Sequence, residues 1–216
     1  MTLDFYYMSG SPPCAVVSLV FATVGIESRV KSHSVDLMGK EQLSPQYLKL
    51  NPQHTCPTIV DDGFVLWESR AIAKYLVGKY GGDLYPEDLK TRAIIDQRLD
   101  FDCGTLYARL AEYYYAPFLF GEPMDEKKLA SLHEALVVLN SFLEGTKYAA
   151  GSALTLADYC LAVTVSVIET ADISVQDYPK IVRWHALVKS TIPKYEEIIG
   201  KYMQDFKDYI DNLTKE

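Results

Sequence analysis

The chain has 216 residues, 49% hydrophobic and 23% charged, which is enough apolar material to bury a core without disulfide staples. Its 29 acidic and 21 basic residues leave a net charge of −8 with no lysine- or arginine-rich run. This balance argues against nucleic acid or an anionic membrane as the main partner, because phosphate binding needs clustered cations. The first residues lack a basic region followed by a long apolar run, so we expect no signal peptide, and no apolar stretch is long enough to span a bilayer.

The first strand and helix lie within the first 25 residues. Segment 3–8 is rich in aromatic residues and predicts a strand. After a Ser-Gly-Ser-Pro-Pro turn, apolar residues recur at helical spacing from Cys14 until Gly25, a C-cap residue. Segment 28–35 then predicts a second strand.

A short helix, a hairpin and a longer helix follow. Ser44 opens the short helix, which ends before Asn51. Segment 57–67 predicts two strands around an Asp-Asp-Gly turn, and Ser69 caps a helix that runs to about Lys79. The resulting order, β-α-β-α-β-β-α, is typical of a small mixed α/β sandwich.

The rest of the chain has a helical pattern. Residues 80–86 predict a linker. Amphipathic helices are predicted beyond it, at 88–115, 125–144, 155–171, 178–191 and 194–211. Thr155 and Asp158 resemble a capping box at the start of the third of them. We therefore expect an α+β protein, with an α/β domain at 1–82 and an all-α helical bundle at 88–216.

The cysteines and histidines bear on metal and redox chemistry. The four cysteines are far apart and form no CxxC pair, and the four histidines do not cluster. We therefore expect no disulfide framework and no metal site, and a reducing cytoplasm fits this usage best.

The first candidate for chemistry is Ser11-Pro12-Pro13-Cys14, between the first strand and the first helix. A helix N-terminus favours an anion, a thiolate included. The segment has the form of a redox CxxC motif in which serine replaces the first cysteine. Its hydroxyl can donate a hydrogen bond to the thiolate of another molecule. The alternative is an N-cap serine with no ligand.

Two further segments offer contacts to a peptide-like ligand. Pro57 opens a strand and is a candidate for a cis bond, which would leave the backbone of Cys56 free to pair with an extended peptide. Ser69 at a helix N-cap and Glu68 beside it match the carboxylate and the ammonium of an amino-acid head group. Each segment also has a simpler interpretation, a turn before an edge strand and a capped helix with solvated charges.

Together the three segments, YYMSGSPPC, NPQHTCPTI and DDGFVLWESRAI, resemble the cytosolic glutathione transferases in order and spacing, most of all the delta class of arthropods. In the helical half, DQRLDFDCGTLY, AEYYYAPF and GSALTLADYCLA look like segments of the same class, so the resemblance covers essentially the whole chain. It implies a thioredoxin-like domain that binds glutathione and an all-helical domain that lines the electrophile site. It also implies a cytoplasmic homodimer that acts in detoxification and uses no cofactor beyond the co-substrate glutathione.

The resemblance assigns roles residue by residue. Ser11 matches the catalytic serine. The residues matched to glutathione binding are Gln53, His54, Thr55, Cys56, Pro57, Glu68, Ser69, Arg70 and Asp102. Among them, His54 faces the glycine end, Cys56 and Pro57 hold the cysteinyl backbone, and the last four surround the γ-glutamyl group. The residues matched to the electrophile site are Pro13, Cys103, Tyr107, Tyr115, Phe118 and Phe120.

Rival residues lie close to Ser11. Ser9 stands where the class often has proline, so it competes for the role of catalytic hydroxyl. Tyr6 and Tyr7 end the first strand and must point to opposite faces, so at most one of them could reach the sulfur. Cys14 could indicate thiol-transferase chemistry, but it lies a turn inside the helix and is expected to be core.

The implied reaction is attack of the glutathione sulfur on carbon. A thiol with a pKa of about 8.5 is only slightly ionised at neutral pH, and lowering it by about two units requires ~2.7 kcal/mol. A hydrogen bond to the charged sulfur and the helix N-terminus can supply that. The alternative from another class is a protein that binds glutathione or apolar ligands without turnover. Because Ser11 and the Glu68-Ser69-Arg70 group are all present, the sequence favours the enzyme.

Overall fold

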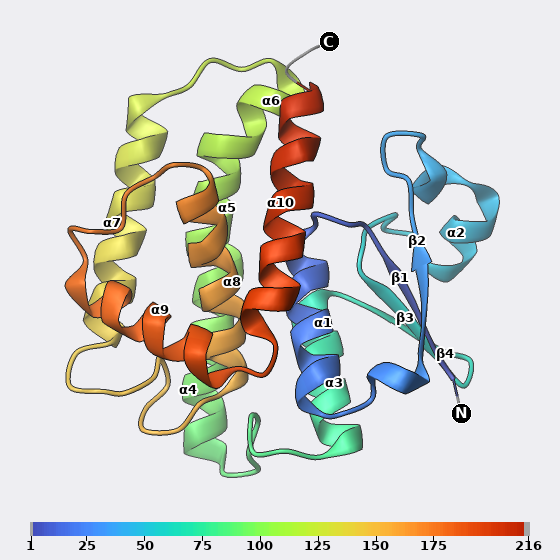
Figure 1. The fold of residues 1–216 in the computed structure, drawn as a ribbon, viewed down its shortest axis with the longest axis horizontal. Coiled ribbons are helices and arrows are strands. Elements are labelled where there is room, and N and C mark those ends of the chain that lie inside the picture. Colours follow the sequence, from blue (N-terminus) through green and yellow to red (C-terminus); the bar gives the residue numbers. More distant parts are fainter. Residues whose placement is uncertain (1, 214–216) are drawn as a thin grey trace. The chain divides into compact units, whose positions relative to one another are not determined.

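The computed structural model describes residues 2–213, which fall into two compact units (Figure 1). The first unit comprises the chain up to Gly82 together with Pro193–Phe206, and the second comprises Asp83–Ile192 and the chain from Lys207. The last helix, α10 (Tyr195–Leu213), therefore contributes to both units. This grouping follows proximity in space, and the domain bounds 1–82 and 88–216 stay a prediction.

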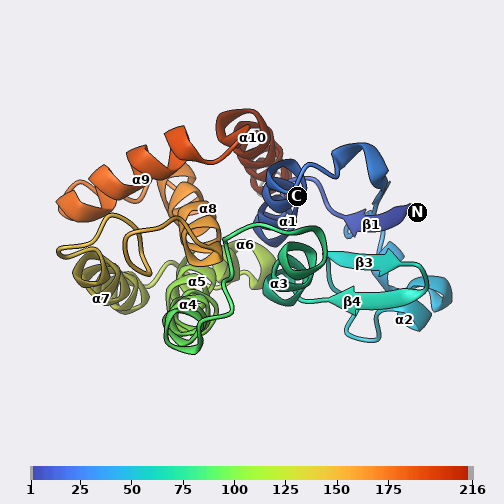
Figure 2. The same ribbon diagram turned by 90° about the horizontal axis from the view of Figure 1, so that it is seen from below.

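A four-stranded mixed sheet in the order β2-β1-β3-β4 forms the frame of the first unit. Strand β1 (Leu3–Tyr7) is parallel to β2 (Val30–Ser34) and antiparallel to β3 (Thr58–Asp61), which pairs with β4 (Phe64–Trp67). Figures 1 and 2 show α1 (Pro12–Thr23) and α3 (Ser69–Tyr80) on one face of this sheet, and α2 (Pro45–Leu50) on the other. The predicted order of elements and the mixed α/β class are confirmed.

Helix α1 is the centre of the first unit. It is apolar around its whole circumference, as expected of a helix that is covered on all sides. Towards the sheet, Phe21 packs edge-on against Phe5 of β1, with 5.0 Å between ring centroids. On another side, the hydroxyl of Ser18 lies 3.0 Å from that of Tyr202 in α10. The middle and the end of α1 are thus held between the sheet and the last helix.

Two local predictions differ from the structure in the first unit. The second strand begins at Val30, because Glu27–Arg29 form a 3₁₀ turn before it. Helix α3 has Glu68 as its N-cap, so Ser69 is its first helical residue, and the prediction of Ser69 as the cap was wrong by one position. The Glu68 side chain makes no cap hydrogen bond, so a rule based on capping side chains selects Ser69 instead.

The second unit is helical throughout. Its helices are α4 (Leu89–Phe101), α5 (Tyr107–Leu110), α6 (Ala116–Phe120), α7 (Glu126–Phe142), α8 (Leu156–Thr170) and α9 (Pro179–Thr191). The segment predicted as one helix at 88–115 is interrupted by two π-helical turns, Asp102–Leu106 and Ala111–Tyr115. An apolar period of 3.6 residues does not reveal an i→i+5 bond, so the sequence pattern missed both turns.

Helix α8 forms the core of the second unit and is buried from Leu156 to Ile168. The predicted capping box at its start is confirmed. Asp158, which is fully buried, accepts hydrogen bonds from the amides of Thr155 (2.9 Å) and Ala149 (2.8 Å) and from the indole of Trp184 (2.8 Å). One carboxylate therefore joins the helix start, the preceding loop and α9.

Candidate functional site

Ser11 is the N-cap of α1, with an extended backbone (φ −83°, ψ 116°), and is half-buried. Its amide donates to the carbonyl of Met8 (3.2 Å), and its carbonyl accepts from Ala15 (3.0 Å). Its hydroxyl does not cap the helix. The backbone of Ser11 is therefore fixed, while its hydroxyl makes no cap bond to the helix and acts instead on the neighbouring Cys14 thiol.

The cysteine three residues further on is not a nucleophile. Cys14 is fully buried, and this burial raises the pKa of its thiol to about 12, although the Ser11 hydroxyl and the Met8 backbone act in the opposite direction. At neutral pH the thiol is un-ionised. The structure thus agrees with the expectation that Cys14 belongs to the core.

The rival hydroxyl, that of Ser9, is already engaged. It donates a hydrogen bond to the carboxylate of Asp205 in α10. The two tyrosines of β1 point to opposite faces of the sheet, as expected. Tyr7 stacks on Phe5 on the face covered by α1, whereas Tyr6 stacks on His33 at a centroid distance of 4.6 Å.

Each tyrosine lines a different hollow of the first unit. Tyr7 faces a cavity of about 290 Å³ between α1, β2 and α10, with Ser18 and Tyr202. Tyr6 faces one of about 380 Å³ beside α2, with Tyr47. Ser11 is not among the residues that line these two cavities.

The loop that precedes β3 is organised by Asn51, a residue that the sequence analysis did not select. Asn51 is fully buried, and its side-chain amide donates to the carbonyl of Thr55 (2.9 Å) and the hydroxyl of Thr58 (3.0 Å). Its side-chain oxygen accepts from the amide of Gln53 (2.9 Å). The signal for it in the sequence is an asparagine at a helix end directly before proline, a position that favours side-chain to backbone bonds.

The same loop contains the predicted cis bond, between Cys56 and Pro57. The Tyr47 hydroxyl donates to the carbonyl of Thr55 at 2.7 Å and lies 3.4 Å from the Cys56 sulfur. Burial raises the pKa of the Cys56 thiol, so this cysteine is a packing group rather than a thiolate. His54 and Gln53 lie on the exposed side of the loop, and His54 has a left-handed backbone, with φ 49°.

The third predicted segment starts α3. Glu68 is exposed and has φ 72° and ψ 107°, a conformation that a residue with a side chain rarely adopts and that is found preferentially at functional sites. Ser69 is buried at the first helical position, and the Ile72 amide donates to the carbonyl of Glu68 (2.9 Å). The amides of the first turn have no acceptor within a helix, so this end can bind a carboxylate.

Six predicted site residues belong to the second unit. Asp102 is fully buried at the start of the first π-helical turn and accepts a hydrogen bond from Thr164 (2.7 Å). Tyr107 and Tyr115 lie edge to face, with 6.0 Å between centroids, and Tyr114 connects Tyr115 to Phe118. Burial raises the pKa of Tyr115 far above its usual value.

The remaining two are Cys103 and Phe120. The side chain of Cys103 is exposed. Phe120 ends α6, and its side chain lies outside the described part of the structure. The structure shows contacts among Tyr107, Tyr114, Tyr115 and Phe118, while the ligand roles of all predicted site residues stay predictions.

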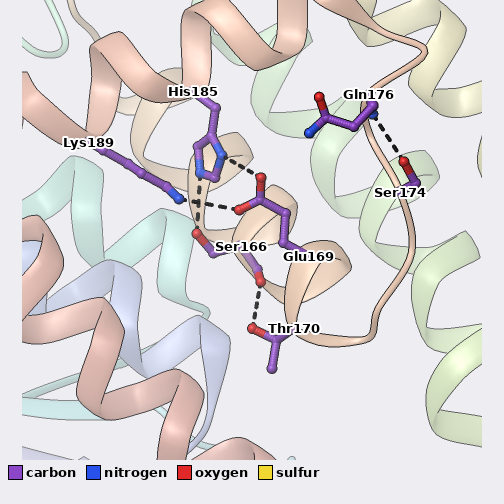
Figure 3. A network of polar contacts seen from close by, with 7 residues as sticks. All are labelled: Ser166, Glu169, Thr170, Ser174, Gln176, His185 and Lys189. Carbon is purple, nitrogen blue, oxygen red and sulfur yellow. Dashed lines mark hydrogen bonds and ion pairs between the residues drawn. The ribbon is translucent and has the colours of Figure 1, made fainter.

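A second polar constellation lies between α8 and α9 (Figure 3). The Ser166 hydroxyl is 3.2 Å from Nε2 of His185, and Nδ1 of His185 is 3.5 Å from the carboxylate of Glu169, which also binds Lys189 (3.2 Å). Burial acts to raise the pKa of Glu169, but His185 and Lys189 outweigh it and hold that pKa below its usual value. Because Ser166 and His185 are both buried, the arrangement joins two helices and gives a substrate no access to the hydroxyl.

Two further kinds of feature are clusters of metal-binding side chains and helices that could span a membrane. Within residues 2–213, no three His, Cys, Asp or Glu side chains come together as a metal site. Over the same residues, no helix combines the length and the apolar composition needed to cross a bilayer.

The comparisons with known proteins identify the family. The glutathione S-transferase N-terminal domain matches residues 5–83, and the glutathione S-transferase C-terminal domain matches residues 106–190. A delta-class glutathione transferase of Nilaparvata lugens is 41% identical, with a TM-score of 0.93 over 98% of this chain and 99% of that one. A Bombyx mori glutathione transferase is 38% identical (TM-score 0.92, 97% and 98% covered), and an epsilon-class enzyme of the housefly, Musca domestica, is 34% identical (0.90, 98% of both).

The chain therefore belongs to the glutathione S-transferase family and is a transferase enzyme with the two-part fold of that family. The resemblance drawn from its motifs is confirmed.

Proposed function

We propose that this protein conjugates the thiol of glutathione to small hydrophobic electrophiles, and that the hydroxyl of Ser11 stabilises the thiolate. One observation carries the proposal. Just before α1, the hydroxyl of Ser9 donates a hydrogen bond to Asp205. The thiol of Cys14, within the helix, is buried. The hydroxyl of Ser11, by contrast, is not used to cap the helix. A sulfur bound there meets one serine hydroxyl that can donate to it.

The prolines of the first turn make this hydroxyl more important. Pro12 and Pro13 occupy the first two helical positions and have no N–H group. The amide of Ser11 is bonded to Met8, and that of Ala15 to Ser11 itself. The first turn therefore presents few amide donors to an anion, which leaves a larger part to the Ser11 hydroxyl.

The stabilisation that these groups can provide is large enough to ionise the glutathione thiol. A hydrogen bond to a charged group contributes about 1.5–3 kcal/mol, and a helix N-terminus adds about 0.3–1 kcal/mol. Lowering the pKa of a thiol by about two units requires ~2.7 kcal/mol, which places most of the bound sulfur in the thiolate form at neutral pH. The thiol proton leaves to solvent, the sulfur lone pair forms the new bond to carbon, and the leaving group departs with its electron pair.

The other segments of the first unit support the binding of a γ-glutamyl tripeptide. The N-terminal end of α3 suits its α-carboxylate, and Glu68 at that end suits its ammonium. The backbone of Cys56, between Thr55 and the cis bond, suits pairing with the cysteinyl backbone. Gln53 and His54, on the exposed side of the same loop, suit the glycine carboxylate.

The proposal extends to substrate class and assembly. The aromatic groups Tyr107, Tyr114, Tyr115 and Phe118 offer flat apolar faces with polar tips, which suit planar apolar electrophiles of the kind removed in detoxification. We further propose a cytoplasmic homodimer, and sedimentation of the purified protein tests its dimeric state.

The decisive experiment measures turnover of a chlorinated nitroaromatic with glutathione in the wild type, Ser11→Ala and Ser9→Ala. By analogy with the removal of one oxyanion donor, Ser11→Ala should lower kcat/KM by roughly 10²–10³. The apparent pKa of bound glutathione, followed by the ultraviolet absorbance of the thiolate, should return towards about 8.5. A larger loss in Ser9→Ala than in Ser11→Ala would overturn the assignment. Glutathione binding without turnover in the wild type would favour a binding protein.

A further inference from the structure

We propose that Asp205 of α10 is a positioning residue for the reaction: by binding Ser9 it holds the Ser9-Gly10-Ser11 turn, and with it the catalytic hydroxyl, against the last helix. This inference rests on the proposed role of Ser11. It adds to the site a residue from the far end of the chain that makes no contact with substrate.

The first observation is the bond itself. The Ser9 hydroxyl donates to the Asp205 carboxylate, and the two residues are 196 positions apart in the chain. A hydrogen bond to a charged acceptor is about twice as strong as a neutral one. Both side chains are partly buried, so water competes with this bond less than it would on an open surface.

The second observation is independent of that bond. Gly10 is buried and has φ 83°, and a Cβ atom at this position would lie 2.8 Å from the backbone nitrogen of Phe206 and 2.9 Å from the carbonyl carbon of Asp205. The turn thus packs directly on the backbone of α10 at the residue that binds Ser9. Only glycine permits this approach with this backbone conformation.

The third observation is that α10 is a fixed support. Tyr195, Ile199, Tyr202 and Phe206 are all buried, at the spacing of one helix face. Tyr202 meets Ser18 of α1 at 3.0 Å between hydroxyls, and Lys194 binds the carboxylate of Glu27 at 2.9 Å. Figures 1 and 2 show this part of α10 alongside α1. Loss of the Asp205 carboxylate should therefore leave the helix in place.

The consequence concerns geometry. The turn connects the end of β1 to the start of α1, and Ser11 is its last residue before the helix. Without the bond to Asp205, Ser9 is free to rotate and the turn can move away from α10. A displacement of about 1 Å is enough to weaken a catalytic contact severely. Asp205 therefore acts on the thiolate through Ser11.

The test compares Asp205→Ala, Asp205→Asn and Ser9→Ala in the full-length protein. Asparagine retains an oxygen that accepts from Ser9, so Asp205→Asn should keep turnover close to the wild type. Asp205→Ala and Ser9→Ala should each raise the apparent pKa of bound glutathione by about half a unit, which is about threefold in ionisation. Turnover should fall about threefold below that pKa and recover at high pH, with an unchanged KM for glutathione. The double variant should be no worse than either single one, because both remove the same bond.

Glu196→Ala removes an exposed acidic residue from the same helix and serves as the matched control, with wild-type turnover and thiol pKa expected. An unchanged thiol pKa in Asp205→Ala, or a loss of turnover that is equal at all pH values, would overturn the positioning role, even where Ser11→Ala lowers kcat/KM by the expected factor of roughly 10²–10³. If Ser11→Ala leaves turnover intact, the proposed role of Ser11 is refuted. The positioning role of Asp205 is then refuted as well, because it depends on Ser11. The two failures are therefore distinguishable.

Discussion

Replacing Asp158 by asparagine should destabilise the protein by about 2 kcal/mol. Asp158 is fully buried, and one of its oxygens accepts from Ala149 and Trp184, both at 2.8 Å. The other accepts from the amide of Thr155 at 2.9 Å. The oxygen of asparagine can keep the first pair of bonds, but its NH₂ group then faces the Thr155 amide, donor against donor. A buried donor left without a partner costs about 1–3 kcal/mol.

Urea unfolding followed by circular dichroism measures the change, at a fixed protein concentration. For a chain of this size, about 2 kcal/mol should lower the melting temperature by about 4–8 °C. Asp177→Asn makes the same chemical change at an exposed position and should stay within about 0.5 kcal/mol of the wild type. If Asp158→Asn also stays within that margin, the capping network does not stabilise the helix start as argued.

Two further changes test the charges and thiols. Asp61 is 3% exposed, and although its burial acts to raise its pKa, the bonds from Lys79 and Tyr75 outweigh burial and lower it. The pair therefore stabilises the fold above about pH 4, the unfolded value, and this stabilisation is lost as the pH falls through the lowered one. Lys79→Met should thus lower the urea midpoint of unfolding at pH 7 and lower it less near about pH 3. An equal decrease at the two pH values would contradict the stabilising role of the Asp61–Lys79 pair. Iodoacetamide should modify the exposed Cys103 in the native protein. It should leave Cys14 unmodified, because burial raises the pKa of the Cys14 thiol to about 12. Mass spectrometry identifies the alkylated cysteines, and alkylation of Cys14 would refute this prediction.

Local sequence patterns predicted the features that depend on neighbouring residues. The hairpin around Asp61-Asp62-Gly63, the Ser44 cap of α2 and the Thr155–Asp158 box are each set within a few positions of the chain. The cis bond before Pro57 was also anticipated, because a proline that opens a strand restricts the chain strongly.

Features that depend on distant residues were not predictable in this way. The bond from Ser9 to Asp205 joins the two ends of the chain, and no spacing rule connects positions so far apart. The π-helical turns beginning at Asp102 and Ala111 were also missed, because an apolar repeat is insensitive to an i→i+5 bond. The sequence resemblance favoured Ser11 over Ser9, and the structure adds that the Ser9 hydroxyl is bonded to Asp205.

Helix α10 contributes to both units, and this has a consequence for folding during synthesis. The first unit consists of the chain up to Gly82 and of Pro193–Phe206, and all of Asp83–Ile192 is translated between these two pieces. A nascent chain emerging from the ribosome therefore exposes the flank of α1 around Ser18 until the last helix arrives to cover it. Because domains generally fold as they are synthesised, we expect the N-terminal part to stay incomplete and to become protease-resistant only after α10 has been translated.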